Sequence, residues 1–283
     1  MRPERPLGFL PALGEGFFEE RPWAFVEARV HSRLSLKRIR SWRWLYRRMR
    51  VVHLPYSHRG ERLNVADTDA AVRRKSIRVI VEAIRALSEL PVLEKYVLHP
   101  VSLQLWDGKK RGEYRAAVEG LREILERAGK WLRGPVCLEN NRVYYPAGRG
   151  PRTNRIFADN PGEWCRLQED VAHPLLALCL DTSHAVTSAL LHPRRRRDRV
   201  LRAFLACAQR VSHVHWSANF PYDRRGRADS HAPLGTPGTQ RLWFHRMVAA
   251  LPASVTIEIP DREGVEKTLR YLRRYRLWRP PAS

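Results

Sequence analysis

The stretch Leu175-Leu176-Ala177-Leu178-Cys179-Leu180-Asp181-Thr182-Ser183-His184 runs from unbroken apolar residues directly into an aspartate and a histidine. A continuous apolar run of this length is typical of a strand that is buried on both faces of a parallel sheet. Proteins built on α/β barrels carry their chemical groups at the carboxyl ends of such strands. The stretch therefore predicts a core strand that ends in groups available for chemistry.

Similar apolar runs alternate with segments of helical periodicity along the chain, which is the pattern of repeated strand and helix units in a parallel sheet. Six units are clear, written here as strand and then helix: 50–54 and 69–89, 96–98 and 113–128, 136–138 and 163–171, 175–180 and 198–209, 211–216 and 239–251, 255–259 and 262–275. Upstream we expect a strand at 24–30 followed by a basic helix within 33–50, and a weaker first strand at 7–10.

Length and linkers favour one domain. The chain has 283 residues, and α/β barrels commonly reach about 250 residues as one domain. No composition shift or long linker divides the sequence. We therefore predict an α/β fold, a (β/α)8 TIM barrel, as a single domain over residues 1–283. Because few residues separate the first two expected strands, the first helix should be short or missing.

The expected strands end in residues with acid, base or metal-binding chemistry. The strand ends supply His53, His99, Glu139, Asp181 with His184, His215 and Glu258, and a late loop adds Asp229 and His231. Each of these residues alone has an ordinary structural explanation, such as a helix cap or a hydrogen-bonded core histidine. Together, at matching ends of consecutive strands, they indicate a metal site, because imidazoles with carboxylates suit zinc, manganese and iron.

Charge is the most unusual feature of the composition. The formal net charge is +23, which favours a polyanionic partner such as DNA, although an arginine-rich coding bias would give the same excess. Arginines gather in two loops that follow expected strands, and these are the candidate nucleic-acid contacts: Arg142, Arg149, Arg152 and Arg155 in one loop, Arg224, Arg225 and Arg227 in the other.

The remaining features point to a protein of a reducing compartment. The four cysteines show no C-x-x-C spacing, and we expect them to be reduced, buried hydrophobic residues. No apolar run approaches the roughly 18 residues of a membrane-spanning helix. We therefore expect a cytoplasmic protein with no membrane partner.

Several motifs together resemble the xylose isomerase-like superfamily of barrels, which includes sugar isomerases and epimerases and the endonuclease IV group of abasic-site nucleases. The resemblance covers roughly residues 50–272. It is carried by His53-Leu54-Pro55-Tyr56, His99-Pro100, Cys137-Leu138-Glu139-Asn140, Cys179-Leu180-Asp181-Thr182-Ser183-His184, His213-Val214-His215, Asp229-Ser230-His231 with Pro233-Leu234-Gly235, and Thr256-Ile257-Glu258.

Resemblance to the endonuclease branch implies up to three divalent metal ions, zinc in the first place and manganese as an alternative. His53 and His99 would bind the first ion, Glu139 would bridge the first and second, Asp181, His215 and Glu258 would complete the second, and His184, Asp229 and His231 would bind the third. Tyr56 matches the aromatic residue that enters the DNA stack, and Glu139 and Glu258 would be catalytic. We therefore expect a metal-dependent phosphodiesterase that cleaves DNA at abasic or damaged sites.

The isomerase branch implies an alternative function with fewer residues. Glu139, Asp181, His215 and Glu258 would hold one metal ion that polarises a sugar or sugar phosphate, and the two glutamates would transfer a proton. His53, His99, Asp229 and His231 would then contact substrate hydroxyls. A third hypothesis is a basic nucleic-acid-binding barrel with structural metals, but a solvent-open site argues against it.

Overall fold

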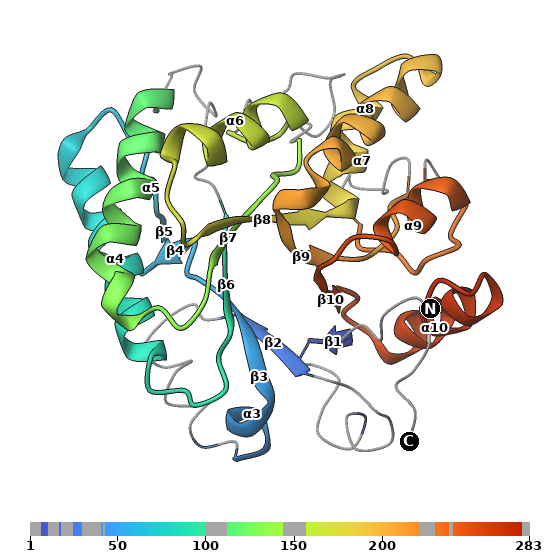
Figure 1. The fold of residues 1–283 in the computed structure, drawn as a ribbon, viewed down its shortest axis with the longest axis horizontal. Coiled ribbons are helices and arrows are strands. Elements are labelled where there is room, and N and C mark those ends of the chain that lie inside the picture. The colour runs from blue at the N-terminus through green and yellow to red at the C-terminus, as the bar shows by residue number, and fades with distance from the viewer. Residues whose placement is uncertain are drawn as a thin grey trace.

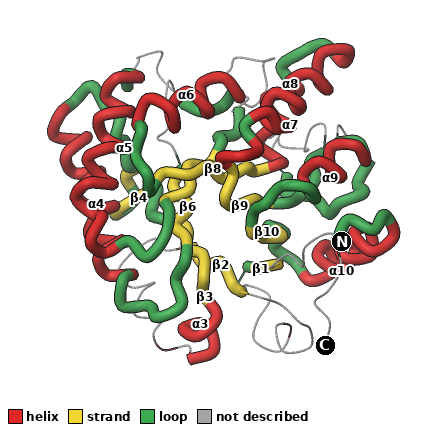
Figure 2. The backbone as a smooth tube through the Cα atoms, viewed as in Figure 1, coloured by secondary structure: helices red, strands yellow, loops and turns green. Residues whose placement is uncertain are grey.

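Eight parallel strands close into a barrel at the centre of the molecule (Figures 1 and 2). The computed structural model describes residues 7–10, 17, 25–29, 41, 43–99, 112–143, 157–220, 230–237 and 240–278. The barrel strands are β1 (Leu7–Phe9), β2 (Phe25–Arg29), β3 (Met49–His53), β6 (Lys95–Leu98), β7 (Val136–Glu139), β8 (Leu176–Asp181), β9 (Val211–His215) and β10 (Ser254–Ile257). Pairing of β1 with both β2 and β10 closes the barrel, which confirms the expected (β/α)8 TIM barrel.

Helices surround the strands (Figure 1). They are α3 (Arg43–Arg48), α4 (Ala70–Leu87), α5 (Tyr114–Ala128), α6 (Pro161–Val171), α7 (Thr182–Leu190), α8 (Arg194–Ala206), α9 (Leu242–Val248) and α10 (Arg262–Arg274), with short 3-10 helices η2 (Gly129–Trp131) and η3 (Ala208–Arg210). A small antiparallel pair, β4 (Ser57–His58) and β5 (Glu61–Arg62), follows β3. None of the described helices is long and apolar enough to cross a membrane.

Local sequence explains where the outer helices begin and which face they bury. The Asp69 carboxylate accepts hydrogen bonds from the first amides of α4, and the Asp261 carboxylate does so for Gly264 in α10. Buried positions of α4 recur at helical spacing, from Ile77 through Ile80 to Ile84 and Leu87. These helices therefore pack as the alternating pattern predicts.

The two-residue alternation of side chains along each strand places the polar residues at the mouth of the barrel. Phe25, Val51, Val97, Cys137 and Cys179 form a buried cluster contributed by five neighbouring strands. Successive residues on a strand face opposite sides, so the residue two positions later points inward again. Two residues after each member of this cluster lie, in order, Glu27, His53, His99, Glu139 and Asp181. The barrel interior thus contains a layer of apolar side chains and, next to it toward the carboxyl ends of the strands, a layer of polar side chains.

Several expected boundaries differ from the structure. The helix expected at 198–209 begins earlier, at Arg194, and a separate helix, α7, precedes it. Every residue of α7 is buried, so its sequence lacks the polar face by which an outer helix is recognised. Within 33–50, α3 ends at Arg48 because Met49 already pairs with β2. Residues 30–40 and most of the segment between β1 and β2 lie outside the described residues. The expectation of a short or missing first helix therefore stays a prediction.

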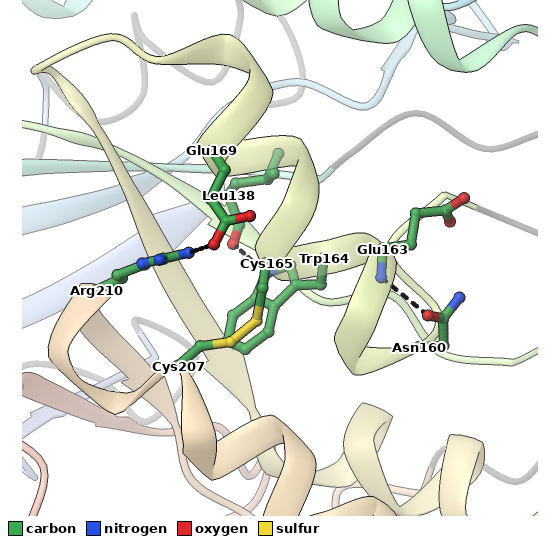
Figure 3. Close-up of a disulfide and its surroundings, with 8 residues drawn as sticks. All are labelled: Leu138, Asn160, Glu163, Trp164, Cys165, Glu169, Cys207 and Arg210. Atoms are coloured by element: carbon green, nitrogen blue, oxygen red, sulfur yellow. Dashed lines mark hydrogen bonds and ion pairs between the residues drawn. A yellow bond between two sulfur atoms is a disulfide. The ribbon is translucent and has the colours of Figure 1, made fainter.

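One expectation about the cysteines is wrong. Cys137 and Cys179 are buried and free, as expected, but Cys165 and Cys207 form a disulfide between α6 and the end of α8 (Figure 3). The two helices pack side by side, which brings the Cα atoms to 6.4 Å across a separation of 42 residues. Sequence spacing gives no sign of this pairing. Because a disulfide is present, the cysteines no longer support a reducing compartment, and the cytoplasmic location stays a prediction.

The disulfide should contribute measurably to stability. It closes a long loop, and cross-links of this kind typically stabilise a domain by about 2–4 kcal/mol. We expect the double variant Cys165→Ser/Cys207→Ser to lose that much free energy of unfolding in urea titrations. Reductant should lower the stability of the parent to the level of the variant and leave the variant unchanged. Equal stability of the oxidised parent and the variant would show that the cross-link is energetically neutral.

Candidate metal centre

Polar side chains from consecutive strands converge at the carboxyl end of the barrel. The structure brings together His53 in β3, His99 after β6, Glu139 in β7, Asp181 in β8, His215 in β9 and Glu258 after β10. His184 joins them from the first turn of α7, and His231 joins from the loop before α9. Asp229 lies outside the described residues. All the expected metal ligands that the structure describes therefore belong to adjoining groups of potential ligands.

Four of these residues form the largest group of potential ligands among the described residues. Glu139, Asp181, His215 and Glu258 each offer a ligand atom, and these atoms all lie within 4.8 Å of one another. The Nδ1 atom of His215 is 3.0 Å from Glu139 Oε1, 3.2 Å from Glu258 Oε2 and 3.8 Å from Asp181 Oδ2. All four residues are buried. Three carboxylates thus surround one imidazole nitrogen without solvent to separate them.

The hydrogen bonding of this group is incomplete in a way that fits a cation. Among the described residues, Glu139 Oε2, Asp181 Oδ2 and Glu258 Oε2 are buried and have no hydrogen-bond partner. Burial of an unpartnered carboxylate oxygen is costly, and a divalent cation would remove that cost by accepting these oxygens as ligands. The residues at this position can therefore hold a divalent metal ion.

Histidines extend the cluster on two sides. His99 Nε2 lies 3.2 Å from Glu139 Oε2, and His53 Nε2 lies 3.8 Å from the same oxygen. On the other side, Asp181, His184 and His231 form a further group of potential ligands. The resemblance placed Asp229 with His184 and His231, whereas the described residue that accompanies these histidines is Asp181.

The ionisation of the carboxylates differs within the cluster. Burial, with the nearby charges of Glu258 and Glu139, raises the pKa of Asp181 to about 7 against the opposing effect of His184 and His231. Burial also disfavours the charged form of Glu258, but His215, His231 and Arg29 outweigh it and lower its pKa to about 2. Glu258 is therefore ionised at neutral pH, whereas Asp181 takes up a proton more readily than an ordinary aspartate.

Asn140 fixes the backbone between two site residues. Its side chain accepts a hydrogen bond from the Asp181 amide at 2.6 Å and donates one to the Asp181 carbonyl at 3.0 Å. The Asn140 carbonyl lies 2.8 Å from His184 Nδ1, and the Asp181 carboxylate caps α7 through the His184 amide. These contacts give a structural reason for the asparagine that follows Glu139 in the sequence.

Two residues of β2 belong to the site although the sequence did not single them out. Glu27 lies at hydrogen-bond distance from both His213 and His215, and Arg29 forms an ion pair with Glu258. Burial disfavours the charged form of Glu27, but His215 and His213 outweigh it and hold its pKa well below the ordinary value. The sequence does carry a signal, because Phe25, Glu27 and Arg29 occupy alternate positions of the expected strand at 24–30. Glu27, however, lies within this strand and not at its end.

The expected nucleic-acid residues are mostly outside the described chain. Arg149, Arg152, Arg155, Arg224, Arg225 and Arg227 all lie in undescribed segments. Arg142 is half-buried. Tyr56 is 44% exposed, and its ring meets that of His99 edge-on at 6.0 Å between centroids. The structure thus places Tyr56 at the rim of the cluster.

Comparison with known proteins identifies the family. The model of the xylose isomerase-like TIM barrel family matches residues 27–275, and the chain belongs to that family. No curated protein matches the sequence. Among solved structures, a D-tagatose 3-epimerase-like protein has a TM-score of 0.66 at 19% identity, over 95% of this chain and 96% of its own.

Two further solved structures share the fold over nearly their whole length. A xylose isomerase domain protein from Planctomyces limnophilus has a TM-score of 0.64 at 13% identity, over 98% of each chain. The 3-keto-D-glucoside 4-epimerase from E. coli has a TM-score of 0.62 at 14% identity, over 96% of this chain and 100% of its own.

The expectation of a DNA endonuclease is wrong. Similar solved structures include a D-tagatose 3-epimerase-like protein, an L-ribulose 3-epimerase, a D-psicose 3-epimerase and a 3-keto-D-glucoside 4-epimerase. These favour the isomerase or epimerase alternative over hydrolysis of DNA. The physical reason is that a three-ion nuclease site contains all four residues of a one-ion isomerase site. The presence of the larger set in the sequence therefore did not exclude the smaller one.

Metal binding should weaken as the pH falls through 7. Because the pKa of Asp181 is raised to about 7, a proton occupies this carboxyl at lower pH and the ion must displace it. We expect the affinity for Mn²⁺, measured by calorimetry between pH 6 and 8, to fall by up to about tenfold per unit below pH 7. Asp181→Asn should bind more weakly with a flatter pH dependence. A constant affinity in the parent would contradict this prediction.

Proposed function

We propose that the protein is a divalent-metal-dependent sugar isomerase or epimerase. The observation that carries the proposal is the buried group of Glu139, Asp181, His215 and Glu258, whose potential ligand atoms lie within 4.8 Å of one another. Each of the three carboxylates in this group has one oxygen without a hydrogen-bond partner among the described residues. Membership of the xylose isomerase-like family and the fold shared with sugar epimerases support it. On this proposal the partner is a small sugar rather than a nucleic acid.

The ligand chemistry favours manganese over the zinc expected from the resemblance. Three carboxylates and one imidazole form an oxygen-rich set, and carboxylate ligands suit manganese and magnesium, whereas zinc is typically held by more nitrogen or sulfur. When bound, such an ion would polarise a substrate carbonyl and the adjacent hydroxyl. We propose one manganese ion per chain at this group.

Glu139 and Glu258 are suited to move a proton on the substrate. The two carboxylates flank His215 Nδ1, at 3.0 and 3.2 Å, so a sugar at this point would contact both. One glutamate would take the proton from the carbon next to the carbonyl. The other would return a proton to the opposite face in an epimerase, or a proton would be returned to the neighbouring carbon in an isomerase.

Arg29 would help His215 and His231 to keep Glu258 in its charged form. The guanidinium pairs with Glu258 from the end of β2, and its side chain remains 41% exposed at the mouth. Burial opposes the charge of Arg29, but Glu258 and Glu139 outweigh it and raise its pKa above the ordinary value. Glu258 is therefore available as a base at neutral pH.

The surrounding histidines would bind substrate hydroxyl groups. Burial lowers the pKa of His53 to about 3 and also lowers that of His99, against the opposing effect of Glu139. Both imidazoles are therefore neutral near pH 7 and can donate and accept hydrogen bonds. His99 is the more accessible of the two, with 25% of its side chain exposed.

Removal of either glutamate should abolish proton transfer. We expect Glu139→Gln and Glu258→Gln each to lower kcat for conversion of a ketose by roughly 10²- to 10⁴-fold, and to stop deuterium uptake at the reacting carbon in D₂O. Glu61→Gln, at an exposed position on β5, is the control and should behave as the parent. If a manganese-loaded parent converts no member of a panel of ketoses and aldoses, the proposed function is wrong.

A variant of His99 can distinguish a site with one metal ion from a site with several. If His99 contacts substrate, His99→Ala should raise KM while the chain still binds one metal ion. Metal content by elemental analysis and kinetics on the converted sugar provide the measurement. A parent with two or more ions, one of which is lost from the variant, would show instead that His53, His99 and Glu139 form a second metal site.

A further inference from the structure

Glu27 is a carboxylate enclosed in the centre of the barrel. It lies in the middle of β2, it is fully buried, and both of its oxygens are engaged by imidazoles. Its Oε1 atom is 2.9 Å from His215 Nε2, and its Oε2 atom is 3.0 Å from His213 Nε2. An ionised carboxylate only accepts hydrogen bonds, so both imidazoles donate their Nε2 protons to it.

The other ring nitrogen of His213 contacts a serine. Lys95 Nζ donates to Ser254 Oγ at 2.8 Å, and Ser254 Oγ lies 2.7 Å from His213 Nδ1. A serine hydroxyl both donates and accepts, so it can pair with Nδ1 in either tautomer. The direction of the second contact is therefore set by the Glu27 carboxylate, which only accepts, so that His213 carries a proton on Nε2.

The first contact fixes the orientation of the proposed ligand. With Nε2 protonated and bonded to Glu27, His215 presents Nδ1 to Glu139 and Glu258. Histidines that bind metals commonly donate their other ring N–H to a carboxylate, which sets the ring orientation and strengthens the ligand. We infer that Glu27 is a positioning residue, which holds His215 so that Nδ1 is the nitrogen that binds the metal ion. This inference rests on the metal site of the proposed isomerase.

The alternative is that Glu27 itself binds a metal ion. Glu27, His53 and His215 do offer atoms within 4.8 Å of one another. However, each Glu27 oxygen already accepts a hydrogen bond of ordinary length from an imidazole, whereas His53 Nε2 is farther away, at 3.5 Å. Both Glu27 oxygens are thus held by His213 and His215 rather than by His53, the third member of that group. The geometry therefore assigns Glu27 to orientation.

The variant Glu27→Gln tests this role because the amide has the same shape. A glutamine offers one acceptor and one donor, so it cannot accept from both imidazoles, and one of them must change its protonated nitrogen. We expect Mn²⁺ affinity, measured by calorimetry, to fall about 10- to 100-fold, as for other carboxylates that orient metal-binding histidines. Glu163→Gln, at a buried glutamate of α6, is the matched control and should leave the affinity unchanged.

The protonated nitrogen can also be observed directly in the parent, which keeps the test valid if the variant does not fold. In the Zn²⁺-loaded, ¹⁵N-histidine-labelled protein, we expect His215 to show a protonated Nε2 and a metal-bound Nδ1. A protonated Nδ1 in the parent would overturn the inference, as would Glu27→Gln with the affinity of the parent. Neither readout requires sugar turnover. If both expected results are obtained but the parent converts no sugar, only the proposed function is rejected.

Discussion

The mutual repulsion of buried carboxylates is the constraint on which the mouth of this barrel depends. Glu139, Asp181 and Glu258 lie around a single imidazole nitrogen, each with an oxygen that has no hydrogen-bond partner among the described residues. Carboxylates in such surroundings either take up protons or require a cation. Within the chain itself the conflict is reduced by the raised pKa of Asp181 and by the ion pair between Arg29 and Glu258.

The barrel makes this arrangement possible because the apolar side chains that fill it and the polar side chains of the site occupy different positions along each strand. The apolar cluster of Phe25, Val51, Val97, Cys137 and Cys179 fills the interior, and the polar layer above it follows from the two-residue period of the strands. The outer wall contributes through α6, whose Trp164 donates to the Leu138 carbonyl beside Glu139. Figure 3 shows this tryptophan next to the disulfide that joins α6 and α8.

Much of the fold and most of the site could be predicted from the sequence because both depend on short local patterns. Apolar runs that end in His, Asp or Glu identified the strands and their chemical ends together. The residues that escaped prediction depend on packing between distant segments. Glu27 lies within a strand rather than at its end, α7 has no polar face, and the partner of Cys165 is 42 residues away.

The choice between hydrolysis and isomerisation was beyond these patterns, because the two chemistries share the four central residues. The positive charge favoured the endonuclease interpretation, which is wrong, because an excess of arginine does not reveal where the arginines lie in the folded structure relative to the site. Most of the arginines taken as nucleic-acid contacts fall in segments that the structure does not describe. The geometry of the described cluster is more informative, because it concentrates three carboxylates on one point.

The most direct test of this account is the position of the metal ion in a crystal of the Mn²⁺-loaded protein, determined from anomalous scattering. The account predicts one peak bound by Glu139, Asp181, Glu258 and the Nδ1 atom of His215. Peaks confined to the histidine groups around His99 or His184, with no ion at these four residues, would contradict it.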